Sequence, residues 1–244
     1  KEISPYRYVG VNFNSQGNPD LKPSDHYNLD LKWDFNPTPT ELISLTAFYK
    51  LIKNPISRIE VASAGGYLSY ENIADKATVA GVEVEIRKNL FIRPVSNAAH
   101  GMNKLSLGLN GSYIYTNAEM PLATVTTGSQ LEGAAPWIVN FDLSHNFTKG
   151  ERSFVNTLVL NYVSDKIYTI GTQGYQDMME QGVLTLDFVS HAKLNRHLSL
   201  NLKARNLLNP SYKLSRKANK NGEKVILNDY KKGINISLGV SCTF

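Results

Sequence analysis

Hydrophobic residues fall on alternate positions along most of this chain. In residues 25–35, Tyr27, Leu29, Leu31 and Trp33 are each followed by a polar or charged residue. Successive side chains of a β-strand point to opposite faces, so this pattern predicts a strand with one apolar and one polar face. It recurs in residues 41–51, 78–88, 104–116, 136–147, 153–163, 183–191, 198–205 and 233–244. We therefore predict an all-β protein of about nine antiparallel strands.

Two kinds of antiparallel protein fit this alternation. A soluble sandwich packs its apolar faces on a core, whereas a membrane barrel presents them to lipid around a wet lumen. In our register the apolar faces carry no charge, and short connections alternate with long ones, residues 88–103 being an exception. The long connections lie near residues 52–76, 117–134, 164–181 and 207–229. These features favour a bacterial outer-membrane barrel, with the long connections outside the cell.

The barrel register makes specific assignments. It places six residues toward lipid: Leu158, Leu160, Leu200, Leu202, Leu238 and Val240. Phe48, Ile114 and Ile138 depart from the pattern, because the register places them on the polar face. Glu83, Glu85 and Arg87 share that face of one strand, and Lys203 and Arg205 share it on another. We expect these five charged residues to face the lumen, the first three as an ion-pair ladder rather than an acid–base site.

Composition narrows the choice of function. No run of about 18 apolar residues is present, so no transmembrane helix is predicted. The single cysteine, Cys242, excludes an internal disulfide and a four-cysteine metal site. The net charge of +5 is concentrated in residues 213–224 and 229–233, outside any recognisable nucleic-acid-binding module. Catalytic phosphate-loop and nucleophile-elbow motifs are missing from the sequence. We therefore predict no nucleic-acid partner, cofactor, metal or catalytic site.

Five short segments carry a more specific signal. They are Asn-Pro-x-Leu-Lys-Pro at Asn18 to Pro23, residues 43–56, the Gly-Val-Glu-x-Glu strand within residues 71–90, Leu131 with Gly133 and Pro136, and Asn-Leu-Leu-Asn at Asn206 to Asn209. In this order they resemble the C-terminal barrel portion of TonB-dependent outer-membrane receptors, particularly those of Bacteroidota. The resemblance covers nearly the whole chain.

The resemblance implies a transmembrane antiparallel β-barrel, of which this chain supplies a C-terminal segment of about nine strands. The complete plugged barrel would have about 22 strands. Residues 1–24 would form an extracellular loop and residues 25–244 barrel strands and loops, while the plug domain would lie outside this chain. The first strand, Asp25 to Phe35, would then pair with an upstream segment. The last strand would pair with the first strand of the barrel.

The family function would be binding and energised import of a scarce or large ligand, such as a siderophore, glycan, peptide or cofactor. Implied partners are the rest of the barrel and the plug, the TonB complex, the barrel assembly machinery, and outer-membrane lipid with lipopolysaccharide. A passive porin or structural barrel is the alternative. A barrel hydrolase using His145 or His191 is less favoured.

Three groups of residues have an expected role. Tyr67, Tyr70 and Tyr175 lie in the predicted external loops, where aromatic side chains could bind the ligand. The charged residues of the polar face would meet the plug or the wet lumen. The terminal aromatic residue, Phe244, resembles the assembly signal of outer-membrane barrels.

Overall fold

The computed structural model describes residues 2–4, 7–8, 13–61, 66–95, 101–120, 129–218 and 222–243. Its largest element is an antiparallel sheet of nine strands, which confirms the predicted number. The strands are β3 (Asp25–Phe35), β4 (Leu42–Lys53), β7 (Lys76–Pro94), β8 (Met102–Ala118), β9 (Trp137–Lys149), β10 (Arg152–Val163), β13 (Val183–Lys193), β14 (Leu198–Arg205) and β17 (Asn235–Cys242). Among the described residues, no helix is both long and apolar enough to span a membrane.

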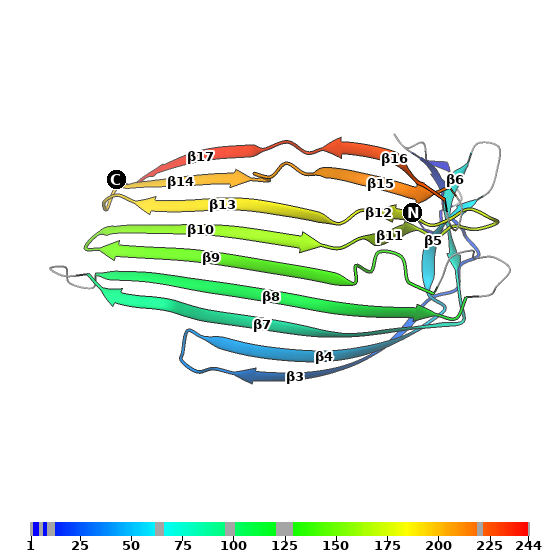
Figure 1. Ribbon diagram of the computed structural model, residues 1–244, viewed down its shortest axis with the longest axis horizontal. Helices are drawn as coiled ribbons and strands as arrows, with labels where there is room; N and C mark the ends of the chain where they lie inside the picture. Colours follow the sequence, from blue (N-terminus) through cyan, green and yellow to red (C-terminus); the bar gives the residue numbers. More distant parts are fainter. Residues whose placement is uncertain are drawn as a thin grey trace.

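The nine strands form an open sheet in the order β17-β14-β13-β10-β9-β8-β7-β4-β3. Each strand pairs with its neighbours in chain order, and β3 and β17 are the two edges. Figure 1 shows a long sheet with the short connections and the C-terminus at one end. The long connections gather at the other end, so the predicted separation of short and long connections is confirmed.

The apolar face of this sheet has the register predicted from the sequence. Leu31 on β3 is 75% exposed, and Leu238 on β17 is 70% exposed. Toward the middle of the sheet, Leu158 pairs in register with Leu143 and Phe188. A soluble sandwich would bury such residues against a second sheet, whereas a lipid-facing surface leaves them uncovered by protein. Because β3 and β17 are exposed on both faces, the distinguishing residue is Leu158 in the middle of the sheet, which is also 37% exposed and favours the barrel.

The long connections differ from the irregular loops expected, because they fold into two further sheets. One contains β1 (Arg7–Tyr8), β2 (Asn14–Gln16), β5 (Ile56–Val61) and β6 (Tyr67–Asn72). The other contains β11 (Lys166–Thr169), β12 (Met178–Glu180), β15 (Ser211–Lys217) and β16 (Lys224–Lys231). Their strands are short and mix polar with apolar residues, so alternation alone did not reveal them. Residues 1–24, expected to be a loop, supply β1 and β2.

Strand β7 corrects two expectations. It continues through Pro94, so much of the connection expected at residues 88–103 is strand. A bulge between Asn89 and Phe91 shifts the alternation by one residue. Before the bulge, Lys88 already lies on the apolar side, where it pairs with Leu107; beyond the bulge, Arg93 falls on the same side because of the shift. The expectation that this face carries no charge is therefore wrong at the end of the sheet near the short turns.

The aromatic exception on the polar face is explained by a glycine. Phe48 lies opposite Gly81, which in turn pairs with Ile114. A Cβ atom added to Gly81 would lie only 2.3 Å from Cζ of Phe48. The missing side chain therefore makes room for the ring, and Phe48 and Ile114 keep the register predicted for β4 and β8.

Candidate ligand site

The two small sheets are joined to each other at the end of the large sheet that carries the long connections. Ile59 of β5 and Ile170, which follows β11, form an isolated parallel bridge. Both side chains belong to one buried apolar cluster with Ile52, Ile73 and Ala77. Three of the four long connections contribute to this cluster, and the fourth joins the first and third through a second cluster of Leu68, Met178 and Leu214. Figure 1 shows the long connections gathered at one end of the sheet.

Two ion pairs cross between these connections. Nη2 of Arg58 lies 2.8 Å from Oε1 of Glu132, and the backbone N–H of Arg58 donates to Oε2 of the same carboxylate at 2.7 Å. Arg216 of β15 pairs with Glu60 of β5. Both pairs are largely shielded from solvent. They fasten β5 to residues before β9 and to the second small sheet.

Two of the recognised motifs act as connectors at this end of the sheet. The backbone N–H of Lys22 donates to Oδ1 of Asn72 at 2.8 Å, and Nδ2 of Asn72 donates to the carbonyl oxygen of Lys22 at 3.0 Å. Asn206 has φ +59° and donates from Nδ2 to the carbonyl oxygen of Gly233 at 2.7 Å. Asn209 accepts from the N–H of Gly233 at 3.1 Å. These asparagines fix the chain where it leaves the large sheet.

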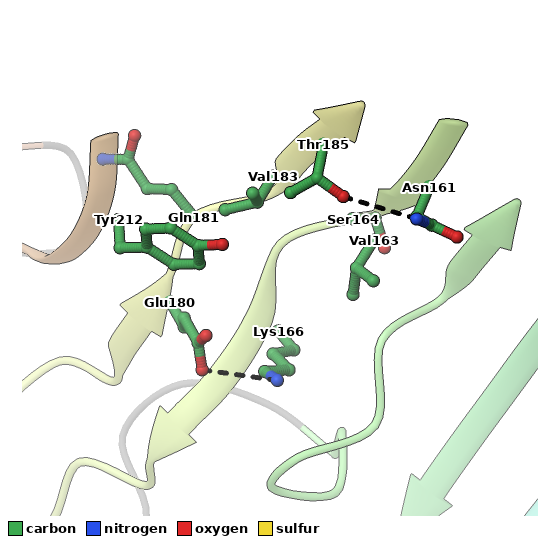
Figure 2. Close-up of a pocket in the computed structure, with 9 residues that line it drawn as sticks. All are labelled: Asn161, Val163, Ser164, Lys166, Glu180, Gln181, Val183, Thr185 and Tyr212. Carbon is green, nitrogen blue, oxygen red and sulfur yellow. Dashed lines mark hydrogen bonds and ion pairs between the residues drawn. The ribbon is translucent and has the colours of Figure 1, made fainter. Parts of the chain in front are cut away.

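A cleft of about 170 Å³ opens where β10 and β13 meet the second small sheet. Figure 2 shows Asn161 and Thr185 on one side of the cleft and Tyr212 on the opposite side, with Lys166 and Glu180 below. Asn161 and Thr185 alternate with the apolar positions of β10 and β13, so they lie on the polar, lumen-side face. Because pockets for drug-sized ligands measure about 300–1,000 Å³, this cleft has room for one part of a larger ligand.

The cleft contains one ion pair, several uncharged polar groups and two valines, and Nζ of Lys232 lies 3.9 Å from the ring centre of Tyr212 beside it. Nζ of Lys166 lies 3.3 Å from Oε2 of Glu180, so the two charges offset each other. Nδ2 of Asn161 donates to Oγ1 of Thr185 at a long 3.5 Å. Tyr212 stacks on Tyr230 with ring centroids 5.5 Å apart, which holds its ring in place. The lining therefore combines amide, hydroxyl and aromatic groups with the apolar side chains of Val163 and Val183.

A row of polar side chains leads from the cleft across the lumen-side face. Asn110, Asn140, Asn161 and Thr185 are successive partners on β8, β9, β10 and β13. Nδ2 of Asn140 donates to Oδ1 of Asn110 at 3.4 Å. We call these four residues the amide row. Sequence reasoning missed it, although amides recurring on the polar faces of adjacent strands were the available signal.

The three tyrosines expected to bind ligand do not line this cleft. Tyr67 and Tyr70 both lie on β6, three positions apart, so they point to opposite faces of that strand. Tyr175 lies between β11 and β12, where the guanidinium of Arg216 is 5.2 Å from its ring centre. The structure therefore does not gather the three rings into one site, and their role stays a prediction.

The charged residues expected in the lumen occupy the polar face. Nη2 of Arg87 lies 2.7 Å from Oε1 of Glu85, and Glu85 pairs in register with Asn110 of the amide row. Glu83 lies two residues before Glu85 on the same face of β7. Lys203 pairs with Val189 and Ser237, and Arg205 with Asn235. Contact of these residues with a plug stays a prediction, and Phe244 lies outside the described residues.

The two histidines considered for hydrolysis lie on opposite faces of the large sheet. His145 is on the apolar side, with Nε2 2.8 Å from Oδ1 of Asn103. His191 is on the polar side, with Nδ1 2.6 Å from Oδ1 of Asn201. They cannot contribute to one shared site. Within the described ranges, no group of three or more histidine, cysteine or acidic residues could hold a metal ion.

Comparison with known protein families supports the same fold. The family model described as TonB dependent receptor-like, beta-barrel, matches residues 2–207, which is most of the chain. Comparisons with curated proteins and with solved structures gave no match. The matched residues include the large sheet through β14 and the first four of the five motifs together with part of the fifth. The chain therefore belongs to the TonB-dependent receptor β-barrel family.

Proposed function

We propose that this chain is part of an outer-membrane receptor that binds a neutral, hydroxyl-rich ligand, of which an oligosaccharide is the best example, and imports it with energy from the inner membrane. The observation that carries the ligand class is the cleft beneath the second small sheet. Its amide, hydroxyl and aromatic groups surround an ion pair that is already balanced.

The amide row supports a path for such a ligand. Asn161 belongs both to the cleft and to the row. A ligand released from the cleft would meet further amide groups of the same kind on β9 and β8. Energised import also requires a plug and an inner-membrane partner, which we assign to other parts of the complete receptor. The remaining barrel, residues 1–24 as an external segment, and recognition of Phe244 by the assembly machinery are parts of the same proposal.

The test uses the complete receptor in its own outer membrane. Asn161→Leu removes the amide shared by the cleft and the row, and Tyr212→Ala removes the ring. Asn146→Leu is the matched control, because Asn146 lies on the same face of β9 nearer the short turns. We expect each of the first two variants to weaken binding of a neutral oligosaccharide about tenfold. This corresponds to the loss of about 1.4 kcal/mol, the free energy of one hydrogen bond or stacking contact. The control should bind normally.

Two further measurements separate ligand class from transport. Collapse of the proton gradient should stop uptake in cells while leaving ligand binding intact, whereas a passive porin would continue to transport. A panel of neutral oligosaccharides and anionic ferric chelates identifies the ligand class. Binding of a ferric chelate that is unaffected by Asn161→Leu would contradict the proposed ligand while leaving the family assignment intact.

A further inference from the structure

A row of polar side chains crosses the outward, apolar face of the large sheet. His145, Asn156 and Ser190 are successive partners on β9, β10 and β13, with Leu105 and Leu202 at the two ends. Oγ of Ser190 donates to Oδ1 of Asn156 at 2.7 Å, and His145 contacts Asn103. We call Asn103, His145, Asn156 and Ser190 the outer polar row. It lies on the face whose other members are mostly leucine, phenylalanine and valine.

Such a row is costly where lipid covers the sheet. Polar groups without a partner in the hydrocarbon region each cost several kcal/mol, and intramembrane polar side chains usually have a function. The two internal hydrogen bonds satisfy only part of the row. Among the described residues, neither the Asn103 nor the Asn156 amide –NH₂ group has a hydrogen-bond acceptor. An occupant that carries hydrogen-bond acceptors would satisfy these donors.

Cations and aromatic rings continue this surface toward the short turns. Phe147 and Phe154 come next, with ring centroids 6.4 Å apart, and Lys149 and Arg152 follow as a register pair. Lys149 lies four positions beyond His145, which is about 13 Å along a strand. The nearest acid in the chain, Glu151, is engaged by Arg196.

The positive charge on this surface is unbalanced. On β7, the guanidinium of Arg93 lies 5.4 Å from the ring centre of Phe91, on the same face. The outward positions of β8, β9, β10 and β13 carry no aspartate or glutamate within the described residues. Cations at the turn end and hydrogen-bond donors deeper in the membrane match the order of the phosphate and the glycerol ester groups in a phospholipid, and Asn103, which pairs in register with Phe147, is the donor nearest the cations.

We propose that this surface binds one anionic phospholipid of the periplasmic leaflet. Lys149 and Arg152 hold the phosphate, assisted by Arg93, and the amide groups of the outer polar row donate to the glycerol ester oxygens. The inference rests on the membrane placement in the proposed function, but not on the identity of the imported ligand. A second copy of the chain fits less well, because a two-fold contact would bring the same cations together.

The experiment uses the complete receptor in nanodiscs that contain equal amounts of phosphatidylglycerol and phosphatidylethanolamine. Native mass spectrometry measures which lipid stays bound on release. In the double variant Lys149→Gln, Arg152→Gln, the preference for phosphatidylglycerol over phosphatidylethanolamine should fall roughly 30-fold. This follows because each cation near an anionic lipid contributes about 1 kcal/mol and the variant removes two. The control is Lys104→Gln, on the opposite face of β8, which should retain the preference.

A second variant tests the polar row by itself. Asn156→Leu with Ser190→Ala keeps the cations but removes the donors, so retention of both lipids should weaken while barrel insertion is preserved. Unchanged preference in the charge variant, or equal loss in Lys104→Gln, would overturn the proposal. So would a change from dimer to monomer in the Asn156→Leu, Ser190→Ala variant without loss of lipid, since it would identify a second copy as the occupant. Ligand uptake, measured in parallel, reports on the proposed function separately.

Discussion

Glu132 accepts two hydrogen bonds from a single residue 74 positions away, Arg58, one from its backbone N–H and one from its guanidinium. The ring of Tyr168 lies 4.3 Å from the same guanidinium. The Glu132 carboxylate thus connects the segment before β9 to the first small sheet. The Arg58 guanidinium that it binds also contacts β11 of the second small sheet. This contact joins three of the four long connections into one structured body.

Glu132→Ala should loosen that body without unfolding the large sheet. The change leaves the Arg58 N–H and a partly buried guanidinium without their acceptor. Breaking fully buried pairs costs about 3–5 kcal/mol. This pair is partly exposed, so we expect roughly 2 kcal/mol, which corresponds to about 30-fold faster hydrogen exchange in β5. Glu119→Ala is the control, because Glu119 forms an exposed pair with Lys76. Equal effects of both changes would contradict this role.

Gly81→Ala should destabilise the large sheet, because the atoms around Gly81 cannot easily move away from an added methyl group. The new Cβ would lie 2.3 Å from the ring of Phe48 and 2.5 Å from the carbonyl oxygen of Tyr113. Overpacking of this kind costs about 1–3 kcal/mol. Heat modifiability on gels would report a lower unfolding temperature for the receptor. Gly111→Ala, where a Cβ meets no atom within 4 Å, should behave as wild type.

Adjacent arginine substitutions on β10 test which face meets lipid. Leu158→Arg places a charge on the outward face and should cost about 2–4 kcal/mol near the midplane, so the fraction of inserted receptor should fall. Val159→Arg places the same charge on the other face, opposite Asp142 and Asp187, where it should be tolerated. Equal insertion of both variants would reject the assignment of the faces.

The three loop tyrosines provide a test that is separate from the cleft. If the rings of Tyr67, Tyr70 and Tyr175 make the first contact with the ligand, changing all three to alanine should weaken ligand binding about tenfold. The expected loss is about 1.4 kcal/mol of stacking free energy. Binding is measured on intact cells, with Tyr115→Ala, on the outward face of β8, as the aromatic control. Full binding by the triple variant would remove these residues from the site and leave the cleft as the candidate.

Several features were determined by the sequence because they depend on local chemistry. Alternation of apolar and polar residues has a period of two only in a strand, so the nine strands of the large sheet and the faces of residues such as Leu158 and Leu238 could be predicted. Short and long connections could be told apart by length. The five motifs indicated the family, and their asparagines were later found at turns and connections.

Tertiary structure alone decided the rest, because it depends on contacts between residues far apart in sequence. The small sheets form when short, weakly patterned segments share the core around Ile59 and Ile170, which no single segment can build. The bulge in β7 brings Arg93 to the apolar face, and strand pairing aligns His145, Asn156 and Ser190 into a row. The cleft likewise requires Asn161 and Tyr212, 51 positions apart, to meet across two sheets. Such sites depend on strand register and side-chain packing, and neither can be determined from the sequence of a single strand.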